Sequence, residues 1–329
     1  MSASGSLKSA LPSLSRRKAF AVVTLLFASA CGGSSTAGPG ATLSPRSTPT
    51  TTGTDVNGTL QSGNFTRTYV LHLPPESSRL KPTPIVIAFH GLPMTAGEMS
   101  RITHLSKVAD AHGFAVLFPQ GYQKSWAVPG GSTPAQQAGI DDVAFVRTLL
   151  EAVGKLYGLD PARVVATGIS NGGILTEFLG CSLSERLLGI VPVAGLMRRD
   201  TAAGCKPARP ISVLGIHGVD DPIASYAGVP GADGFLSFTD TLAFWARVNG
   251  CSSAPVSSPL AGTTVTALTY GGCASGTEVI GYAVKGGGHA WPGGEPIGSA
   301  EEMGETSRQF DASELIWSFL DRHRGAAQL

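Results

Sequence analysis

RVVATGISNGGILTEFL, residues 163–179, joins a β-rich run to a helical run through a turn bounded by glycines. Arg163 to Thr167 predicts a strand, and Gly173 to Leu179 predicts a helix. Between them, Gly168-Ile169-Ser170-Asn171-Gly172 matches the pattern G-x-S-x-G. In a chain with 43 glycines the pentapeptide alone is weak evidence, and a plain Gly/Ser loop is the alternative. Its place between a strand and a helix, where glycines permit a strained turn that exposes the hydroxyl, predicts that Ser170 is a nucleophile.

Outward from this stretch, strands and helices alternate along the chain. An alternating run and several continuous apolar runs predict strands at Thr66 to Leu73, Ile85 to Phe89, Ala115 to Phe118, Gly189 to Val193, Ile211 to Ile216 and Val279 to Val284. Helical spacing predicts helices at Ala96 to Ala111, from Asp141-Asp142 to Val153, at Leu236 to Val248 and at Phe310 to Arg322. Such alternation forms right-handed βαβ units, so the fold class is α/β, with a mostly parallel sheet and helices on both faces.

The N-terminal residues have the pattern of an export signal. Arg16-Arg17-Lys18 precede the apolar run Ala19 to Phe27, which is too short for a stable membrane span. We expect residues 1–30 to be a signal peptide. Ala28-Ser29-Ala30-Cys31 resembles a bacterial lipobox, in which Cys31 is lipidated and becomes the new N-terminus. Ala28 stands where Leu is commoner, so ordinary cleavage that leaves a free cysteine is the alternative.

A flexible tether is expected after the signal. Residues 31–55 are mostly Gly, Ser, Thr and Pro and cannot bury enough apolar surface to offset their ordering entropy. Residues 56–329 then form the catalytic domain. The formal net charge is +1 and the Lys and Arg residues are scattered, which argues against a nucleic-acid partner. We expect an exported protein anchored at a membrane or cell surface through the N-terminal lipid, or also released, without an obligate protein partner.

Four cysteines follow Cys31, and in an exported chain they indicate two disulfides with three alternative pairings. Pairing by proximity in sequence joins Cys181 to Cys205 and Cys251 to Cys273. None of them forms a CxxC motif or lies close to a histidine, so we expect no zinc site. No other sequence motif indicates a metal or a cofactor, and we expect neither.

A serine nucleophile needs a base and an acid that orients it. His289 lies beyond a late predicted strand in a loop too rich in glycine to be explained by packing, Gly286 to Gly294. The acid should follow a strand between serine and histidine, where Asp220 and Asp221 both stand. Asp221 is the preferred candidate, and its structural alternative is a turn cap before Pro222. Asp233 and Asp240 come next.

The developing oxyanion needs two aimed donors. One is expected from the amide of Asn171, at the start of a helix, and the other from the amide of Leu92, after the strand Ile85 to Phe89. Gly91 allows this loop to turn sharply, and His90 is interpreted as a structural residue beneath it.

Several stretches together resemble the esterase family that contains polyhydroxybutyrate depolymerases, feruloyl esterases and acetyl xylan esterases, especially its depolymerase-like lipoproteins. They are Phe89-His90-Gly91, Phe118-Pro119-Gln120-Gly121 with Trp126, Asp141 to Phe145, Gly168 to Gly173, Pro192 to Gly195, His217 to Pro222 and Gly288 to Gly293. The resemblance implies an α/β-hydrolase fold and a triad of Ser170, Asp221 and His289. It also implies that Trp126 and Trp291 border the substrate cleft, against the alternative that Trp126 is a packing ring.

The sequence thus predicts an exported serine esterase that acts through an acyl-enzyme. Short-chain, hydroxyalkanoate-oligomer and feruloyl or acetyl esters are the expected substrates, and small soluble esters are favoured over polymer granules because no polymer-binding module follows the last predicted helix. Two alternatives remain: a surface lipoprotein that binds carbohydrate or lipid on an inactive hydrolase scaffold, and an acyltransferase.

Overall fold

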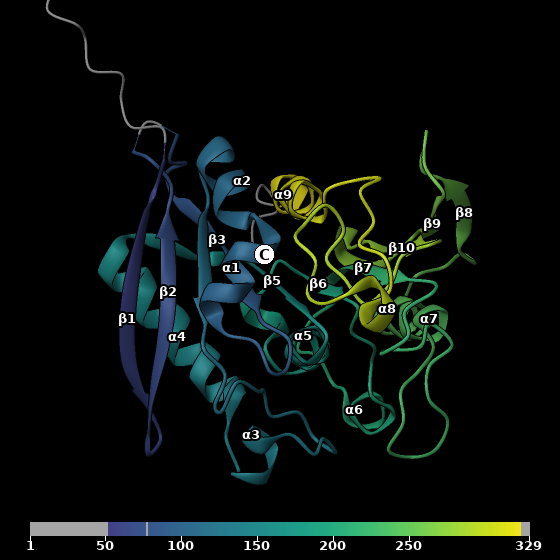
Figure 1. Cartoon of the computed structure of the whole chain (residues 1–329), viewed down its shortest axis with the longest axis horizontal. Coiled ribbons are helices and arrows are strands. Elements are labelled where there is room, and N and C mark those ends of the chain that lie inside the picture. The colour runs from purple at the N-terminus through teal and green to yellow at the C-terminus, as the bar shows by residue number, and fades with distance from the viewer. Residues whose placement is uncertain (1–51, 77, 324–329) are drawn as a thin grey trace, which may run out of the picture. The chain divides into compact units, whose positions relative to one another are not determined.

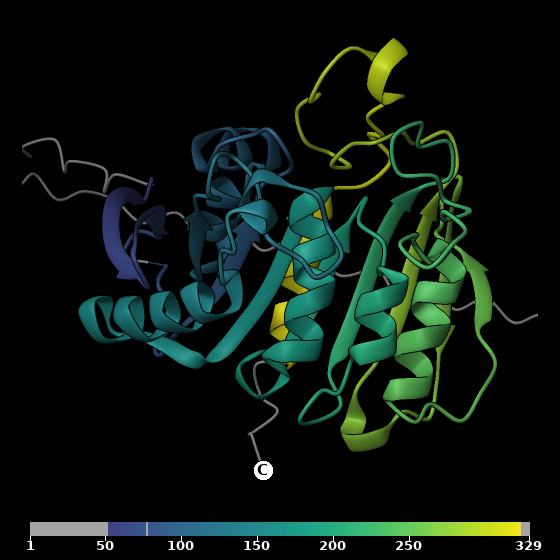
Figure 2. The same cartoon turned by 90° about the horizontal axis from the view of Figure 1, so that it is seen from below.

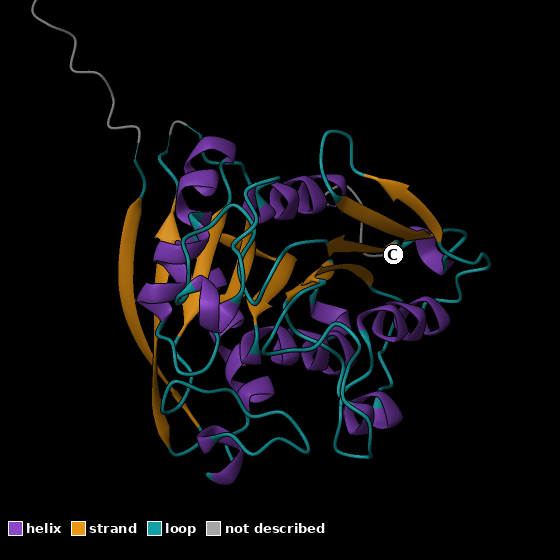
Figure 3. Ribbon diagram, turned by 45° about the vertical axis from the view of Figure 1, so that its right-hand side comes forward, coloured by secondary structure: helices purple, strands orange, loops and turns teal. Residues whose placement is uncertain are grey.

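A ten-stranded sheet forms the centre of the computed structural model, which describes residues 52–76 and 78–323. Its strands are β1 Thr54–Ser62, β2 Phe65–Leu73, β3 Thr83–Phe89, β4 Ala115–Pro119, β5 Leu159–Ile169, β6 Gly189–Val193, β7 Ser212–Gly218, β8 Val256–Pro259, β9 Val265–Tyr270 and β10 Val279–Val284. They are ordered β1-β2-β4-β3-β5-β6-β7-β10-β9-β8. Figure 1 labels most of these strands, and Figure 3 shows the strands in orange among the purple helices. The six from β4 to β10 in that order run parallel, and the outer pairs are antiparallel. The predicted mostly parallel sheet is confirmed.

Helices cover both faces of the sheet. They are α1 Ala96–Thr103, α2 Leu105–His112, α3 Pro134–Gln137, α4 Asp142–Tyr157, α5 Asn171–Ser182, α6 Arg199–Gly204, α7 Phe238–Val248, α8 Ala300–Met303 and α9 Ala312–His323, with 3₁₀ turns at Ser184–Arg186 and Ala274–Gly276. One core layer contains side chains of α4, α5 and α7, and the other contains side chains of α1, α2 and α9. Figure 2 shows α4, α5 and α7 on one side of the sheet and α9, in yellow, behind it. Burial on both faces explains the continuous apolar runs of the central strands.

The single helix predicted over Ala96 to Ala111 is wrong, because the chain breaks at His104. This residue has the left-handed φ of 55° and separates α1 from α2. The Thr103 hydroxyl donates to the carbonyl of Met99 at 2.8 Å and accepts from the amide of Leu105 at 3.4 Å. These local bonds satisfy backbone groups where the helix is interrupted. The spacing of apolar residues, which predicts one helix, carries no sign of this interruption.

The predicted boundary between tether and domain also needs correction. Thr54 and Asp55, assigned to the tether, are the first residues of β1 and pair with Leu73 and His72 of β2. Asp55 Oδ1 lies 2.6 Å from His72 Nδ1, which ties this end of β1 to the sheet. The predicted signal peptide, Cys31 and the tether up to residue 51 lie outside the described residues. Among the described helices, none is long and apolar enough to cross a membrane.

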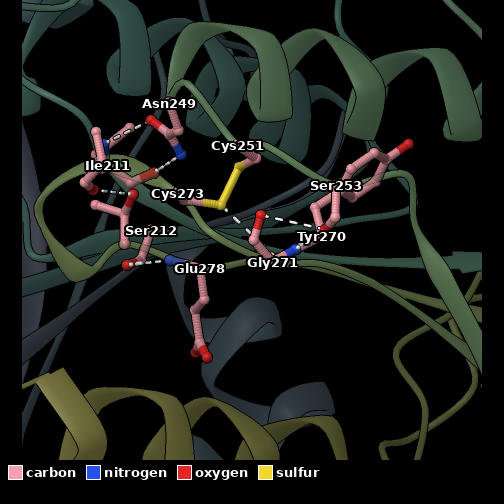
Figure 4. The surroundings of a disulfide bond; sticks show 11 residues. Ile211, Ser212, Asn249, Cys251, Ser253, Tyr270, Gly271, Cys273 and Glu278 are labelled. Carbon is pink, nitrogen blue, oxygen red and sulfur yellow. Dashed lines mark hydrogen bonds between the residues drawn. A yellow bond between two sulfur atoms is a disulfide. The ribbon is translucent and has the colours of Figure 1, made fainter.

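Both disulfides join the pairs expected from the sequence, Cys181–Cys205 and Cys251–Cys273. The first connects the end of α5 to the residue after α6. The second links the segment after α7 to the segment after β9 (Figure 4). Beside it, the Asn249 side chain accepts from the amide of Ile211 at 3.0 Å and donates to its carbonyl at 2.6 Å. This end of the sheet is therefore anchored where the chain enters β7, the strand that leads to Asp220 and Asp221.

Candidate active site

Ser170 stands at the sharp turn between β5 and α5. Its φ of 56° and ψ of −122° are unfavourable for a residue with a side chain, at a cost of about 1–3 kcal/mol. Glycines make the turn possible: a Cβ on Gly168 would lie 2.5 Å from the carbonyl oxygen of Gly172, and one on Gly172 would lie 2.2 Å from that of Phe89. Ser170 is the N-cap residue of α5, yet its side chain makes no capping hydrogen bond. The Ser170 hydroxyl therefore does not cap the helix and is available for another interaction.

Asp221 and His289 form a close pair on two neighbouring loops. His289 Nδ1 lies 2.8 Å from Asp221 Oδ2, and both side chains are almost completely buried. The other carboxylate oxygen, Oδ1, accepts from the amides of Ile223 at 2.8 Å and Ala224 at 2.7 Å. With the proton on Nδ1 donated to Asp221, the neutral imidazole carries its lone pair on Nε2. That is the tautomer a general base needs.

Asp220 has a different set of partners. Its Oδ2 accepts from the amide of Gly286 at 2.8 Å, and its own amide donates to the carbonyl of Gly287. Asp220 therefore holds the start of the loop that carries His289, whereas Asp221 contacts the imidazole.

The glycine-rich loop positions His289 through its backbone. The amide of His289 donates to the carbonyl of Met303 at 2.6 Å, and that of Gly288 donates to the carbonyl of Glu305 at 2.8 Å. A Cβ on Gly288 would lie 2.3 Å from the carbonyl oxygen of Met303, so this close approach requires glycine.

Ser170 and His289 line one cavity of about 160 Å³. Its wall is otherwise mainly apolar and contains no charged side chain: Ile174, Ala194, Leu196, Ile223, Ala224, Ser225, Val229 and Phe235. Ile223 and Val229 are among the exposed large apolar residues, at 57% and 46%. A neutral, apolar group is what this space accommodates best.

The two segments expected to supply oxyanion donors lie beside Ser170. A Cβ on Gly91 would be 3.3 Å from the Cβ of Ser170, so the loop that contains Leu92 packs closely against the serine. Asn171 is the first residue of α5, where amides have no acceptor within the helix and the helix dipole favours negative charge.

His90 is fully buried, in agreement with its interpretation as a structural residue. Its Nε2 accepts from the amide of Gly121 at 3.0 Å, and its Nδ1 lies 2.9 Å from the carbonyl oxygen of Gly91. Burial lowers the pKa of His90 from 6.5 to about 4, so the ring is neutral near pH 7.

The expectation that Trp126 and Trp291 border the cleft is not met. Both side chains are fully buried, at 0% exposure, and neither lines the cavity. The Trp126 indole N–H donates to the carbonyl of His90 at 2.8 Å, and that of Trp291 donates to the Ser313 hydroxyl at 3.1 Å. For Trp126, the burial agrees with the alternative interpretation, that its ring packs in the interior.

Sequence reasoning missed a buried ion pair near this site. Arg67 Nη2 lies 2.8 Å from Asp142 Oδ1, and Asp142 Oδ2 accepts from the amide of Ala127 at 2.7 Å. From the sequence, Asp141 and Asp142 are candidate caps of the predicted helix and part of a stretch that carries the family resemblance, and neither interpretation predicts an ion pair. Asp141 does cap α4 by accepting from the amide of Ala144 at 2.9 Å, but Asp142 points inward. The sequence feature that could have indicated the ion pair is the second of two consecutive aspartates, Asp142, since only Asp141 is needed to cap the helix.

Another missed residue is His217, which is buried beside Asp221. Its Nε2 donates to the carbonyl of Ala224 at 2.7 Å and lies 3.6 Å from Asp221 Oδ2. Burial lowers its pKa below the usual range, which keeps this second imidazole neutral. Within residues 52–76 and 78–323, no cluster of three or more His, Cys, Asp or Glu side chains could hold a metal ion.

The sheet order, the helices on both faces and the serine at the β5–α5 turn are those of the α/β-hydrolase fold. Solved structures agree at the level of the fold. The acetyl xylan esterase from Aspergillus awamori superposes with a TM-score of 0.54 over 71% of this chain and 94% of its own, at 17% identity. An acylaminoacyl peptidase from Pyrococcus horikoshii gives 0.51 over 83% of this chain and 42% of its own, at 13% identity.

Sequence comparisons are more specific. Residues 67–197 match the family model described as esterase PHB depolymerase. A protein named as an esterase, NocK from Nocardia uniformis subsp. tsuyamanensis, is 28% identical, covering 93% of this chain and 98% of its own. Feruloyl esterase B of Piromyces equi is 29% identical over 64% of this chain, which spans only 40% of that protein. Feruloyl esterase C of Emericella nidulans is 26% identical over 77% of this chain and 83% of its own. Residues 67–197 are thus similar to the esterase PHB depolymerase family, and the chain is a carboxylic ester hydrolase.

Proposed function

We propose that this protein hydrolyses small carboxylic esters through a triad of Ser170, His289 and Asp221. The observation that carries the proposal is the shared cavity of Ser170 and His289, with Asp221 bonded to the far nitrogen of the imidazole. His289 Nε2 takes the proton from the Ser170 hydroxyl as Oγ attacks the ester carbonyl, and later gives it to the departing alcohol. Water then attacks the acyl-enzyme: His289 Nε2 takes the proton from the water and returns it to Ser170 Oγ as the acid is released. Asp221 remains ionised and stabilises the imidazolium.

The amides of Leu92 and Asn171 are the proposed donors to the oxyanion. Gly91 packs against Ser170, and Asn171 follows it at the N-terminus of α5, so both segments border the point of attack. Preorganised donors of this kind supply much of the rate enhancement in acyl transfer.

The cavity supports a substrate with one small, uncharged, apolar group next to the ester. A dry apolar cavity of about 150 Å³ holds a benzene ring, so about 160 Å³ suits a short acyl chain or a single aromatic ring. Names of the relatives, which include feruloyl and acetylxylan esterases, agree with this range. We therefore place acetyl, short hydroxyacyl and feruloyl esters among the substrates to test, with water as the acyl acceptor.

The proposal is tested by active-site labelling and a substrate panel. A fluorophosphonate should label the protein once, at Ser170, because an activated serine attacks phosphorus as it attacks a carbonyl. Ser170→Ala should lose both the label and the hydrolysis of acetyl, butyryl and feruloyl esters. Labelling that persists in Ser170→Ala would contradict the nucleophile. Absence of hydrolysis in a folded wild-type protein would favour the inactive binding scaffold, and ester formation with an added alcohol in preference to hydrolysis would favour an acyltransferase.

Export and anchoring complete the proposal and rest on the sequence of residues 1–55. Lipid on Cys31 would hold the catalytic domain at a membrane surface, where two or more acyl chains give stable attachment and one gives only marginal binding. Produced in a bacterial host that exports it, the wild-type protein should partition into detergent, and Cys31→Ser should partition into the aqueous phase. A wild-type protein found wholly in the aqueous phase would refute lipidation.

A further inference from the structure

Trp126 joins two other buried segments beside the active site and does not line the cavity. Trp126 lies in the connection between β4 and α4 and is fully buried. Its indole N–H donates to the carbonyl of His90 at 2.8 Å, and its backbone amide donates to Asn171 Oδ1 at 2.8 Å. The Trp126 carbonyl accepts from Asn171 Nδ2 at 3.4 Å. One residue thus bonds to both segments that carry the proposed oxyanion donors.

The two bonds act close to those donors. The carbonyl of His90 belongs to the peptide immediately before the one whose amide is that of Leu92. The Asn171 side chain belongs to the residue whose own amide is the second donor. The segments also touch each other, since a Cβ on Gly172 would lie 2.6 Å from the carbonyl oxygen of His90. A shift of Trp126 therefore changes the spacing between the two donors.

Rigid surroundings hold Trp126 itself in place. Its ring meets that of Phe89 edge-on at a centroid distance of 5.2 Å and that of His90 at 4.9 Å. The next amide, of Ala127, is fixed by Asp142, which Arg67 holds in turn. The Arg67 guanidinium also lies 3.9 Å from the centroid of Phe145. Because nearly all these groups are buried and bonded, the arrangement has little freedom to adjust.

We infer that Trp126 is a positioning residue that holds the amides of Leu92 and Asn171 at the separation the oxyanion requires. It touches neither substrate nor reacting atoms and acts through His90 and Asn171. The inference rests on the proposed esterase mechanism, and it assigns the indole N–H a role in the rate of acyl transfer beyond stability. The loss expected on its removal is smaller than for deletion of an oxyanion donor, which costs about 10²–10³-fold in kcat.

Trp126→Phe is the direct test, because it removes the N–H donor and keeps an aromatic ring, and the smaller volume of that ring is matched in the control variant. We expect kcat for a small ester to fall about 10- to 100-fold while KM changes less than about threefold, since misplaced donors weaken transition-state binding and not ground-state binding. The matched control is Trp245→Phe. Trp245 of α7 is also fully buried, and its indole N–H donates at 2.5 Å to Glu177 Oε2, which lies six residues beyond Asn171 on α5; no hydrogen bond joins Trp245 to His90 or Asn171. Its removal should lower thermal stability and leave kcat unchanged.

Asn171→Ala removes the other arm of the contact while keeping the Asn171 amide, and it serves if Trp126→Phe fails to fold. It should show the same loss in kcat, and the double variant should lose less than the product of the two single losses. An unchanged kcat in a folded Trp126→Phe protein, or an equal loss in Trp245→Phe, would overturn the inference.

Hydrogen exchange on the full chain gives a readout that needs no ester. Amides of residues 90–92 should exchange faster in Trp126→Phe than in wild type, and at the wild-type rate in Trp245→Phe. Equal exchange in all three proteins would refute the positioning role. Failure of the esterase mechanism would appear separately, as a wild-type protein without labelling at Ser170, while the exchange comparison still decides whether Trp126 fixes these segments.

Discussion

At the scale of single residues, the two adjacent aspartates after β7 differ in what they can do for the imidazole. Asp221 Oδ2 faces His289 Nδ1, and its other oxygen is held by the amides of Ile223 and Ala224. This grip fixes the carboxylate so that it can orient the ring. Asp220 instead accepts from the amide of Gly286. One carboxylate therefore contacts the proposed base, and the other supports the loop that carries it.

Asp221→Asn should lower kcat about 10³- to 10⁴-fold with little change in fold. The amide oxygen of Asn can still accept from Ile223 and Ala224, but its NH₂ group then faces His289 Nδ1 and selects the wrong tautomer. Asp220→Asn should keep kcat within a few-fold of wild type and lose about 1 kcal/mol of stability with the weakened bond to Gly286. Both variants are compared in one ester assay, with circular dichroism to show that they are folded. A dead Asp220→Asn beside an active Asp221→Asn would reverse the assignment.

How far the site could be predicted depends on how local the signal is. The residues Ser170 and His289 stand out because glycines surround them, and glycine at those positions reflects a backbone constraint visible in the sequence. By contrast, the burial of Trp126 and its hydrogen bond to the carbonyl of His90 depend on a contact between segments 36 residues apart, which no local pattern in the sequence reveals. An aromatic residue in a loop reads equally as a cleft wall or a buried anchor, so this part of the prediction failed.

At the scale of elements, strands buried on both faces were the most predictable. β6 and β10 have the predicted bounds, because a continuous apolar run has clear ends. β8 was missed because all four of its residues are exposed and show no apolar pattern. β1 was placed partly in the tether for the same reason. The break between α1 and α2 depends on one left-handed residue, which the hydrophobic period passes over.

The two disulfides provide an element-scale test because their loops are nearly equal, with sequence separations of 24 and 22 residues. Loop-closure entropy predicts similar contributions, about 3 kcal/mol each, whichever elements they join. Replacing Cys181 and Cys205 by Ala, and separately Cys251 and Cys273, should lower the free energy of unfolding by comparable amounts in urea titrations. Neither pair contacts Ser170, His289 or Asp221 through a hydrogen bond, so kcat at 25 °C should persist in both folded variants. A loss confined to one pair would show that local packing, and not chain entropy, sets the effect.

At the scale of the whole molecule, one buried carboxyl lies between two helices of the same layer. Glu177 of α5 is about 1% exposed and accepts from the Trp245 indole of α7 at 2.5 Å. Burial raises its pKa from 4.5 to about 8, and the hydrogen bond from Trp245 opposes the rise only in part. The helix that carries Ser170 at its start thus carries a carboxyl, two turns on, that is protonated at neutral pH. Its ionisation bears on global stability, because α5 and α7 pack on the same core.

Stability should therefore fall as pH rises through the range between these two pKa values. Between about 4.5 and about 8 the folded protein keeps the Glu177 proton and the unfolded chain releases it. The unfolded state then binds fewer protons, so the free energy of unfolding decreases by up to ~1.4 kcal/mol per pH unit and levels off above pH 8. Glu177→Gln keeps an acceptor for Trp245 and cannot ionise, so its urea unfolding free energy should vary less between pH 5 and pH 9. Glu278→Gln is the control, since Glu278 pairs with Arg322 at the surface and its loss should leave the wild-type slope intact. A wild-type free energy that is level over this range, or a slope retained in Glu177→Gln, would show that Glu177 is ionised in the folded protein at neutral pH.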